Sequence, residues 1–107
     1  MEKRKNPRIV VSNMQIDVSD GIGCCSGTVR DVSPVGLCLA DVAKRFGKNI
    51  EAFTVVASSE NRYFKFRVRS RWEQTERLGK RLGVEIHEPP GQWIEYVSSL
   101  VSRDRKK

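Results

Sequence analysis

The most constraining feature of this 107-residue chain is a strict alternation of side-chain character over residues 63–72. Because successive side chains of a strand point to opposite faces, this period of two predicts a long strand with an apolar inner face and a basic outer face. The inner set is Phe64, Phe66, Val68, Ser70 and Trp72, and the outer set is Tyr63, Lys65, Arg67, Arg69 and Arg71. The basic face is either solvated or contacts the phosphates of a ligand or a partner surface.

Shorter apolar runs bounded by turn residues predict five further strands. These strands lie at residues 9–18, 24–31, 37–40, 50–58 and 81–88. Six antiparallel strands with short connections predict a closed barrel or a sandwich, since closure removes unpaired edges. After Pro89 and Pro90, apolar residues recur at helical spacing, so we expect a helix at about 91–103 that packs one face on the barrel.

A polar turn, Asp31-Val32-Ser33-Pro34-Val35-Gly36, joins the strands at 24–31 and 37–40. Asp31 and Ser33 are two residues apart, so on a strand both point to the same face. Gly36 is expected to supply a positive φ or to leave room for a ligand. Taken alone, the stretch fits a structural turn as well as it fits a binding site.

A basic arm precedes the first strand and changes the interpretation of this turn. Arg4 and Arg8 are four residues apart, and 22 residues separate Arg8 from Asp31. The pattern R-x-x-x-R followed by D-x-S-x-x-G, here RKNPR and DVSPVG, resembles the signature of the PilZ domain, a bacterial receptor for cyclic di-GMP. Residues 83–86 also resemble a late strand of that family, and the resemblance covers essentially the whole chain.

The resemblance implies a mainly β fold, a six-stranded antiparallel β-barrel of the PilZ-like, split-barrel type with a C-terminal α-helix. It implies that cyclic di-GMP is the ligand and that the protein regulates a downstream effector in motility, exopolysaccharide or biofilm output. Residues 1–8 would be a flexible basic arm, and residues 9–107 a single domain. The ligand-binding residues that it implies are Arg4, Arg8, Asp31, Ser33 and Gly36.

Elementary chemistry agrees with these roles. An arginine fork matches phosphate oxygens, the O6 and N7 edge of guanine, and the face of a flat ring. The carboxylate of Asp31 can accept hydrogen bonds from guanine N1 and N2, which favours guanine over adenine. Binding would order the arm against the barrel and present a new surface to a protein effector.

The formal net charge of +7 lies mostly at the two ends of the chain and favours polyanionic partners generally. Two alternatives therefore stay open: a degenerate PilZ-like interaction module that binds no nucleotide, and a small basic barrel that binds nucleic acid non-specifically. Aromatic residues are few and fall mostly on the apolar side of the alternation, so no stacking platform for single strands is evident. We expect no specific nucleic-acid partner, and a monomer or weak dimer.

Nothing in the sequence indicates catalysis or metal binding. His87 has no evident orienting partner, and no nucleophile motif is present. Cys24, Cys25 and Cys38 lack the spacing of a zinc site, and an odd number cannot form a fully paired disulfide framework. We expect no enzyme activity, no metal and no cofactor besides the ligand. No apolar run is long enough to span a bilayer and no secretory signal is evident, so we expect a cytoplasmic protein.

Overall fold

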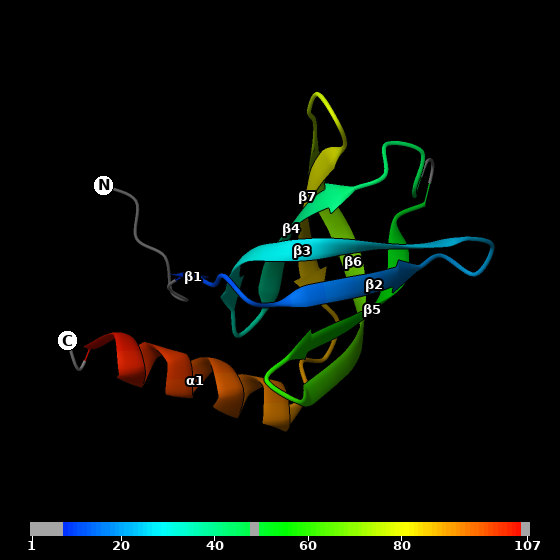
Figure 1. The fold of residues 1–107 in the computed structure, drawn as a ribbon. Helices are drawn as coiled ribbons and strands as arrows, with labels where there is room; N and C mark the ends of the chain where they lie inside the picture. The colour runs from blue at the N-terminus through cyan, green and yellow to red at the C-terminus, as the bar shows by residue number, and fades with distance from the viewer. Residues whose placement is uncertain (1–7, 48–49, 106–107) are drawn as a thin grey trace, which may run out of the picture.

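The computed structural model describes residues 8–47 and 50–105, whose path is shown in Figure 1. These residues form seven strands and one helix. The strands are β1 Ile9–Val10, β2 Gln15–Ser19, β3 Cys24–Ser33, β4 Gly36–Val42, β5 Ala52–Ser59, β6 Arg62–Thr75 and β7 Lys80–Ile86, and the helix is α1 Gly91–Arg105. Arg4, a predicted ligand-binding residue, lies outside the described residues.

Strands β2 to β7 close into an antiparallel barrel, as the turn spacing and the resemblance predicted. The neighbours follow the order β3-β2-β5-β6-β7-β4, and a further pairing of β3 with β4 completes the ring. Since every one of these six strands has a partner on both sides, the barrel presents no free edge. β1 lies outside the ring and pairs with β3, with Val10 opposite Asp31.

The N-terminal part of the sheet differs from the single strand that was predicted over residues 9–18. The chain leaves the ladder between β1 and β2, and the two strands then pair with different parts of β3. The alternation is therefore broken: Met14 and Ile16 are buried, whereas Val10 is 83% exposed. The break carries β1 to the end of β3 that holds Asp31.

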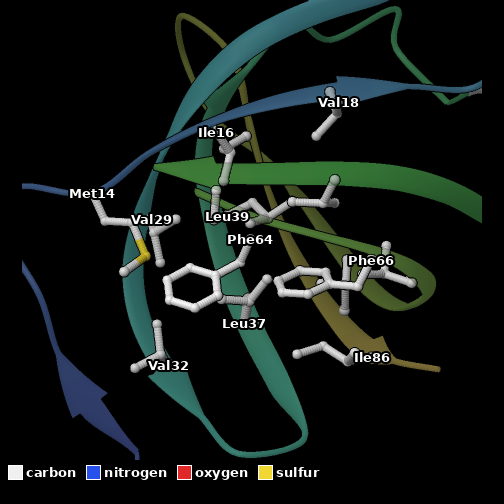
Figure 2. Packing of buried hydrophobic residues seen from close by; sticks show 14 of the residues in the cluster. Met14, Ile16, Val18, Val29, Val32, Leu37, Leu39, Phe64, Phe66 and Ile86 are labelled. Atoms are coloured by element: carbon white, nitrogen blue, oxygen red, sulfur yellow. The ribbon is translucent and has the colours of Figure 1, made fainter. Parts of the chain in front are cut away.

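The barrel interior is filled by side chains that alternate along the strands (Figure 2). Figure 2 shows Phe64 and Phe66 of β6 side by side, with Leu37 and Ile86 beside them. Each buried side chain of this size contributes about 1.5–3 kcal/mol through its removal from water. The alternation predicted for β6 is confirmed as far as Val68, which is 1% exposed.

Helix α1 lies across one end of the barrel (Figure 1). Trp93 anchors it there through contacts with the barrel core. The Trp93 side chain is fully buried, and its ring centroid lies 5.1 Å from that of Phe64 and 5.3 Å from that of Phe66, in edge-to-face contacts. Such contacts add about 0.5–1.5 kcal/mol to the energy of burial. In the part of the chain that the structure describes, no helix has the length and apolar character needed to cross a membrane.

Candidate functional site

β1 brings Arg8 against Asp31. In the antiparallel register Ile9 lies opposite Val32, so the residue before β1 reaches the end of β3. Arg8 Nη1 donates a hydrogen bond to Asp31 Oδ1 at 2.8 Å, and the two side chains are 36% and 23% exposed. Two residues from separate halves of the predicted signature therefore meet at the barrel surface.

The ion pair borders a shallow depression of about 320 Å³. Its side chains come from β3, β4, β6, β7 and the residue before β1. They are Arg8, Arg30, Asp31, Cys38, Trp72 and Arg81. Three guanidinium groups accompany one carboxylate, so the lining carries a formal charge of +2. This arrangement is suited to an anion that also presents flat rings and hydrogen-bond donors.

Trp72 lines the depression because of a β-bulge in β6. The register of β6 against β7 shifts between Ser70 and Trp72, so the inward alternation ends there. The prediction that Trp72 belongs to the inner face is therefore wrong, since the residue is 42% exposed. A bulge re-aims the side chains that follow it, and the sequence pattern of residues 63–72 contains no sign of it.

Gly83 of β7 provides the space that Trp72 occupies. A Cβ atom at this position would collide with the indole ring, so the ring lies directly over the glycine backbone. Glycine within a strand often marks such a close approach. Gly83 is thus the one signal in the sequence from which an outward Trp72 could have been suspected.

Arg81 of β7 is another lining residue that the sequence pattern did not predict. Its Nη2 pairs with Glu76 Oε2 at 2.8 Å, and the side chain is 29% exposed. Its Nε–H is buried and has no hydrogen-bond partner among the described residues. A buried donor without a partner is unfavourable, so an acceptor atom supplied by a ligand would be stabilising there.

Ser33 and Gly36 are not among the residues that line the depression. They close the two-residue turn between β3 and β4. Ser33 is 5% exposed, its Oγ accepts a hydrogen bond from the Val35 N–H at 3.3 Å, and its carbonyl oxygen accepts one from Trp93 Nε1 at 3.1 Å. The turn that follows Asp31 is thereby attached to α1.

Gly36 is required for a reason different from the one expected. Among the described glycines a positive φ occurs at Gly21 and Gly47, and Gly36 is not in this class. A Cβ atom at Gly36 would lie 2.7 Å from the carbonyl oxygen of Val84 in β7. The missing side chain therefore allows β4 and β7 to approach each other closely at this position.

Cys38 is the one thiol in the depression, and it is not activated. Burial, and after it the negative charge of Asp31, raises the pKa of the Cys38 thiol above its ordinary value. A thiol in this state is a poor nucleophile at neutral pH. Among the described residues, no group of three or more His, Cys, Asp or Glu side chains is placed to hold a metal ion.

Comparison with solved structures shows which known proteins share this fold. No protein-family model matches the sequence, and no curated protein matches it. The structure of the Bacillus subtilis inhibitor of motility MotI/DgrA matches 100% of this chain with a TM-score of 0.79 at 10% identity, and this chain covers 54% of it. The PilZ domain of Escherichia coli YcgR, solved with cyclic di-GMP, matches 98% of this chain with a TM-score of 0.73 at 13% identity, and 96% of it is covered.

A third structure, the complex of K. pneumonia MrkH with cyclic di-GMP, matches 100% of this chain with a TM-score of 0.72 at 12% identity. This chain covers 57% of that protein. The chain thus spans little more than half the length of MotI/DgrA and of MrkH, and nearly the whole of the YcgR domain. At sequence identities of 10–13%, the similarity to these structures shows that the chain shares their fold.

Proposed function

Because the chain has the fold of a PilZ domain, we propose that it is a receptor for cyclic di-GMP, which binds in the depression between Arg8 and Trp72. The observation that carries this proposal is the Arg8–Asp31 pair at the border of a depression with two further guanidinium groups and an exposed indole. The structures of YcgR and MrkH with cyclic di-GMP support the choice of ligand.

Charge and hydrogen bonding match this ligand. Cyclic di-GMP carries two phosphate charges, which balance the formal +2 of the lining. Guanidinium groups bind phosphate oxygens and the O6 and N7 atoms of guanine. Asp31 uses Oδ1 for Arg8, so its other oxygen remains to accept from guanine N1 and N2. We therefore assign guanine selectivity to Asp31.

Trp72 is the residue that we assign to base stacking. Its indole lies against Gly83 on one side, and the residue as a whole is 42% exposed. Stacking of a base on an aromatic side chain contributes about 1–3 kcal/mol. Arg81, whose Nε–H has no partner among the described residues, would donate to the phosphate or base beside it.

The remaining signature residues have indirect roles in this proposal. Ser33 and Gly36 shape the turn that presents Asp31, through the contacts with Trp93 and Val84. Arg4 would contact the ligand from the arm of residues 1–8, which would close over it. The closed arm would then offer a surface to a downstream protein effector in the cytoplasm.

Calorimetric titration with cyclic di-GMP tests the proposal, with cyclic di-AMP as the control ligand. We expect saturable binding of cyclic di-GMP in the micromolar range or tighter, and no heat with cyclic di-AMP. Arg8→Ala and Trp72→Ala should each weaken binding at least about tenfold, from the loss of a charge-assisted hydrogen bond or a stacking contact. Arg45→Ala is the matched control, since exposed Arg45 lies outside the depression and its loss should leave affinity unchanged.

We expect Arg8→Ala to remain folded, because the Arg8–Asp31 pair is partly exposed and such pairs contribute about 0–1 kcal/mol to stability. A folded wild-type protein that releases no heat with cyclic di-GMP would rule out the receptor. It would favour a PilZ-like interaction module that binds no nucleotide.

A further inference from the structure

The outer face of β6 carries a row of four cations, Lys65, Arg67, Arg69 and Arg71 (the β6 row). All four are exposed and alternate with core residues as far as the bulge, so they project from one rigid strand. Alternate residues on a strand recur about every 6.8 Å, and four of them extend over about 20 Å. This repeat is close to the separation of neighbouring phosphates along an extended nucleic-acid strand.

The positive charge of the β6 row is only weakly neutralised. Arg71 lies 3.4 Å from a carboxylate oxygen of Glu85 and Arg69 lies 3.9 Å from one of Glu51, with all four side chains more than half exposed. Exposed pairs of this kind contribute little and exchange readily. Lys65 and Arg67 form no ion pair with any described residue, and Arg67 donates to the Thr54 hydroxyl at 3.0 Å. An incoming polyanion would therefore meet available cations.

A separate depression of about 230 Å³ lies at one end of the β6 row. Tyr63 borders it and is 75% exposed on the same face as the row. Its other members include three side-chain amides and a guanidinium group: Asn13, Gln15, Asn61 and Arg62. Glu60, Ser58 and Ser59 complete the lining.

Arg62 is held in position at this depression. Its guanidinium carbon lies 5.2 Å from the ring centroids of both Phe64 and Tyr96, which gives two cation–π contacts. Arg62 forms no ion pair within the described part of the chain. A fixed cation, an exposed aromatic ring and amide donors and acceptors thus converge on one small hollow.

We propose that this face binds single-stranded nucleic acid, with phosphates along the β6 row and one base against Tyr63. The stacked base would direct its edge toward the amides of the depression, which can donate and accept hydrogen bonds. An acidic protein segment would use the cations but would need neither the ring nor the amides. The proposal does not depend on cyclic di-GMP, because the two depressions and the β6 row have no residue in common.

This inference departs from the expectation of no specific nucleic-acid partner. The alternation placed Tyr63 on the outer face, but its position beside an amide-lined hollow depends on Asn13 and Gln15, about fifty residues earlier in the chain. That neighbourhood arises because β2 pairs with β5, which in turn pairs with β6.

Filter binding with a radiolabelled oligouridylate of about 12 nucleotides, over a range of salt concentrations, tests the β6 row. Four phosphate contacts to a single strand predict a slope of log K against log salt of about −2.8. The double variant Lys65→Gln/Arg67→Gln should reduce that slope to about −1.4. Lys44→Gln/Arg45→Gln removes the same charge from the exposed segment between β4 and β5 and should retain the full slope.

Tyr63 is tested with a pair of substitutions. Tyr63→Ala should weaken binding about tenfold through loss of the stacking contact, whereas Tyr63→Phe should bind as the wild type does. All the substituted side chains are exposed, and circular dichroism melting verifies that each variant folds.

Two outcomes would overturn the proposal. The first is an equal loss of affinity in the two double variants, which would mean that net charge alone attracts the oligonucleotide. The second is wild-type binding by Tyr63→Ala together with equally effective competition by polyglutamate, which would assign the β6 row to an acidic protein partner.

Discussion

At the scale of single residues, the Arg8–Asp31 pair holds the proposed ligand-binding groups together before a ligand arrives. The 2.8 Å contact orients both side chains toward the depression. Because the pair is partly exposed, its own contribution to stability is about 0–1 kcal/mol. A guanine or phosphate can therefore replace one partner at small cost, while the geometry of the other is retained.

Cys38 should make the stability of the protein sensitive to alkaline pH. Burial first, and then the Asp31 charge, raises the pKa of this thiol in the folded state. The unfolded chain releases the proton at lower pH than the folded protein does, so the free energy of unfolding falls as pH rises above the ordinary thiol range of about 8.5. We expect the urea midpoint to decline between about pH 8 and pH 10, and Cys38→Ala to decline less.

Cys24→Ala serves as the control for this prediction, because Cys24 is exposed. Its urea midpoint should follow the wild-type curve at every pH. If Cys38→Ala declined as steeply as the wild type, the thiol would not be the group responsible.

The candidate site could be predicted from the sequence only in part, and particular residues show why. Arg8 and Asp31 belong to a spaced signature, and the structure brings them together. Trp72 and Arg81 belong to no signature, and their place in the depression depends on the register of β6 against β7. A bulge changes that register by one residue, and its presence is decided by pairing between strands, which local alternation does not record.

At the scale of elements, β6 changes its role along its length. As far as Val68 it buries alternate side chains in the barrel, and from Lys65 to Arg71 its other face presents the β6 row to solvent. Beyond the bulge it presents Trp72 outward, over Gly83 of β7. One strand thus serves the core, the proposed nucleic-acid face and the proposed cyclic di-GMP depression.

Gly36→Ala tests the close packing of β4 against β7. The added Cβ would meet the backbone oxygen of Val84 at 2.7 Å, and neither atom can rotate away, so β4 and β7 must separate. We expect a loss of about 1–3 kcal/mol in the free energy of unfolding, measured by urea denaturation without ligand. Gly23→Ala is the matched control, since nothing lies within 4 Å of its Cβ position, and it should stay within about 0.5 kcal/mol of wild type.

A wild-type denaturation curve for Gly36→Ala would contradict this account of the glycine.

Most elements could be predicted from local pattern because their signals are local. Alternation, turn residues and helical spacing indicated the barrel strands and the helix after Pro90. The division of residues 9–19 into β1 and β2 could not be predicted, because it depends on how each piece pairs with β3. Barrel closure could not be predicted in detail either, because it depends on the pairings of β2 with β5 and of β4 with β7, whose residues lie far apart in the sequence.

At the scale of the whole molecule, the barrel is a closed platform with α1 across one end and two separate candidate surfaces on its wall. The surfaces share β6 but no lining residue, so ligands at the two could bind together. Trp93 links the platform to the helix through the carbonyl oxygen of Ser33. Ser33 is only two residues after Asp31, so this hydrogen bond connects α1 to the strand that carries the central residue of the proposed cyclic di-GMP site.

Ligand binding should be visible in the thermal stability of the whole domain. A ligand that binds only the folded state adds about 2.7 kcal/mol at a concentration of 100 times its Kd. For a domain of this size we expect the Tm to rise by about 10 °C with cyclic di-GMP, and to be unchanged with cyclic di-AMP. Arg8→Ala should show a clearly smaller rise at the same ligand concentration, and an equal rise would remove Arg8 from the site.

The two tryptophans of this chain occupy opposite environments, and this gives the protein a built-in optical probe. Trp93 is fully buried among aromatic rings, so we expect its fluorescence maximum at short wavelength. Trp72 is 42% exposed, so we expect its fluorescence maximum at longer wavelength. A base stacked on Trp72 would quench the red component and leave the blue one as an internal reference. The ratio of the two intensities would therefore report occupancy of the depression separately from unfolding, without any attached dye.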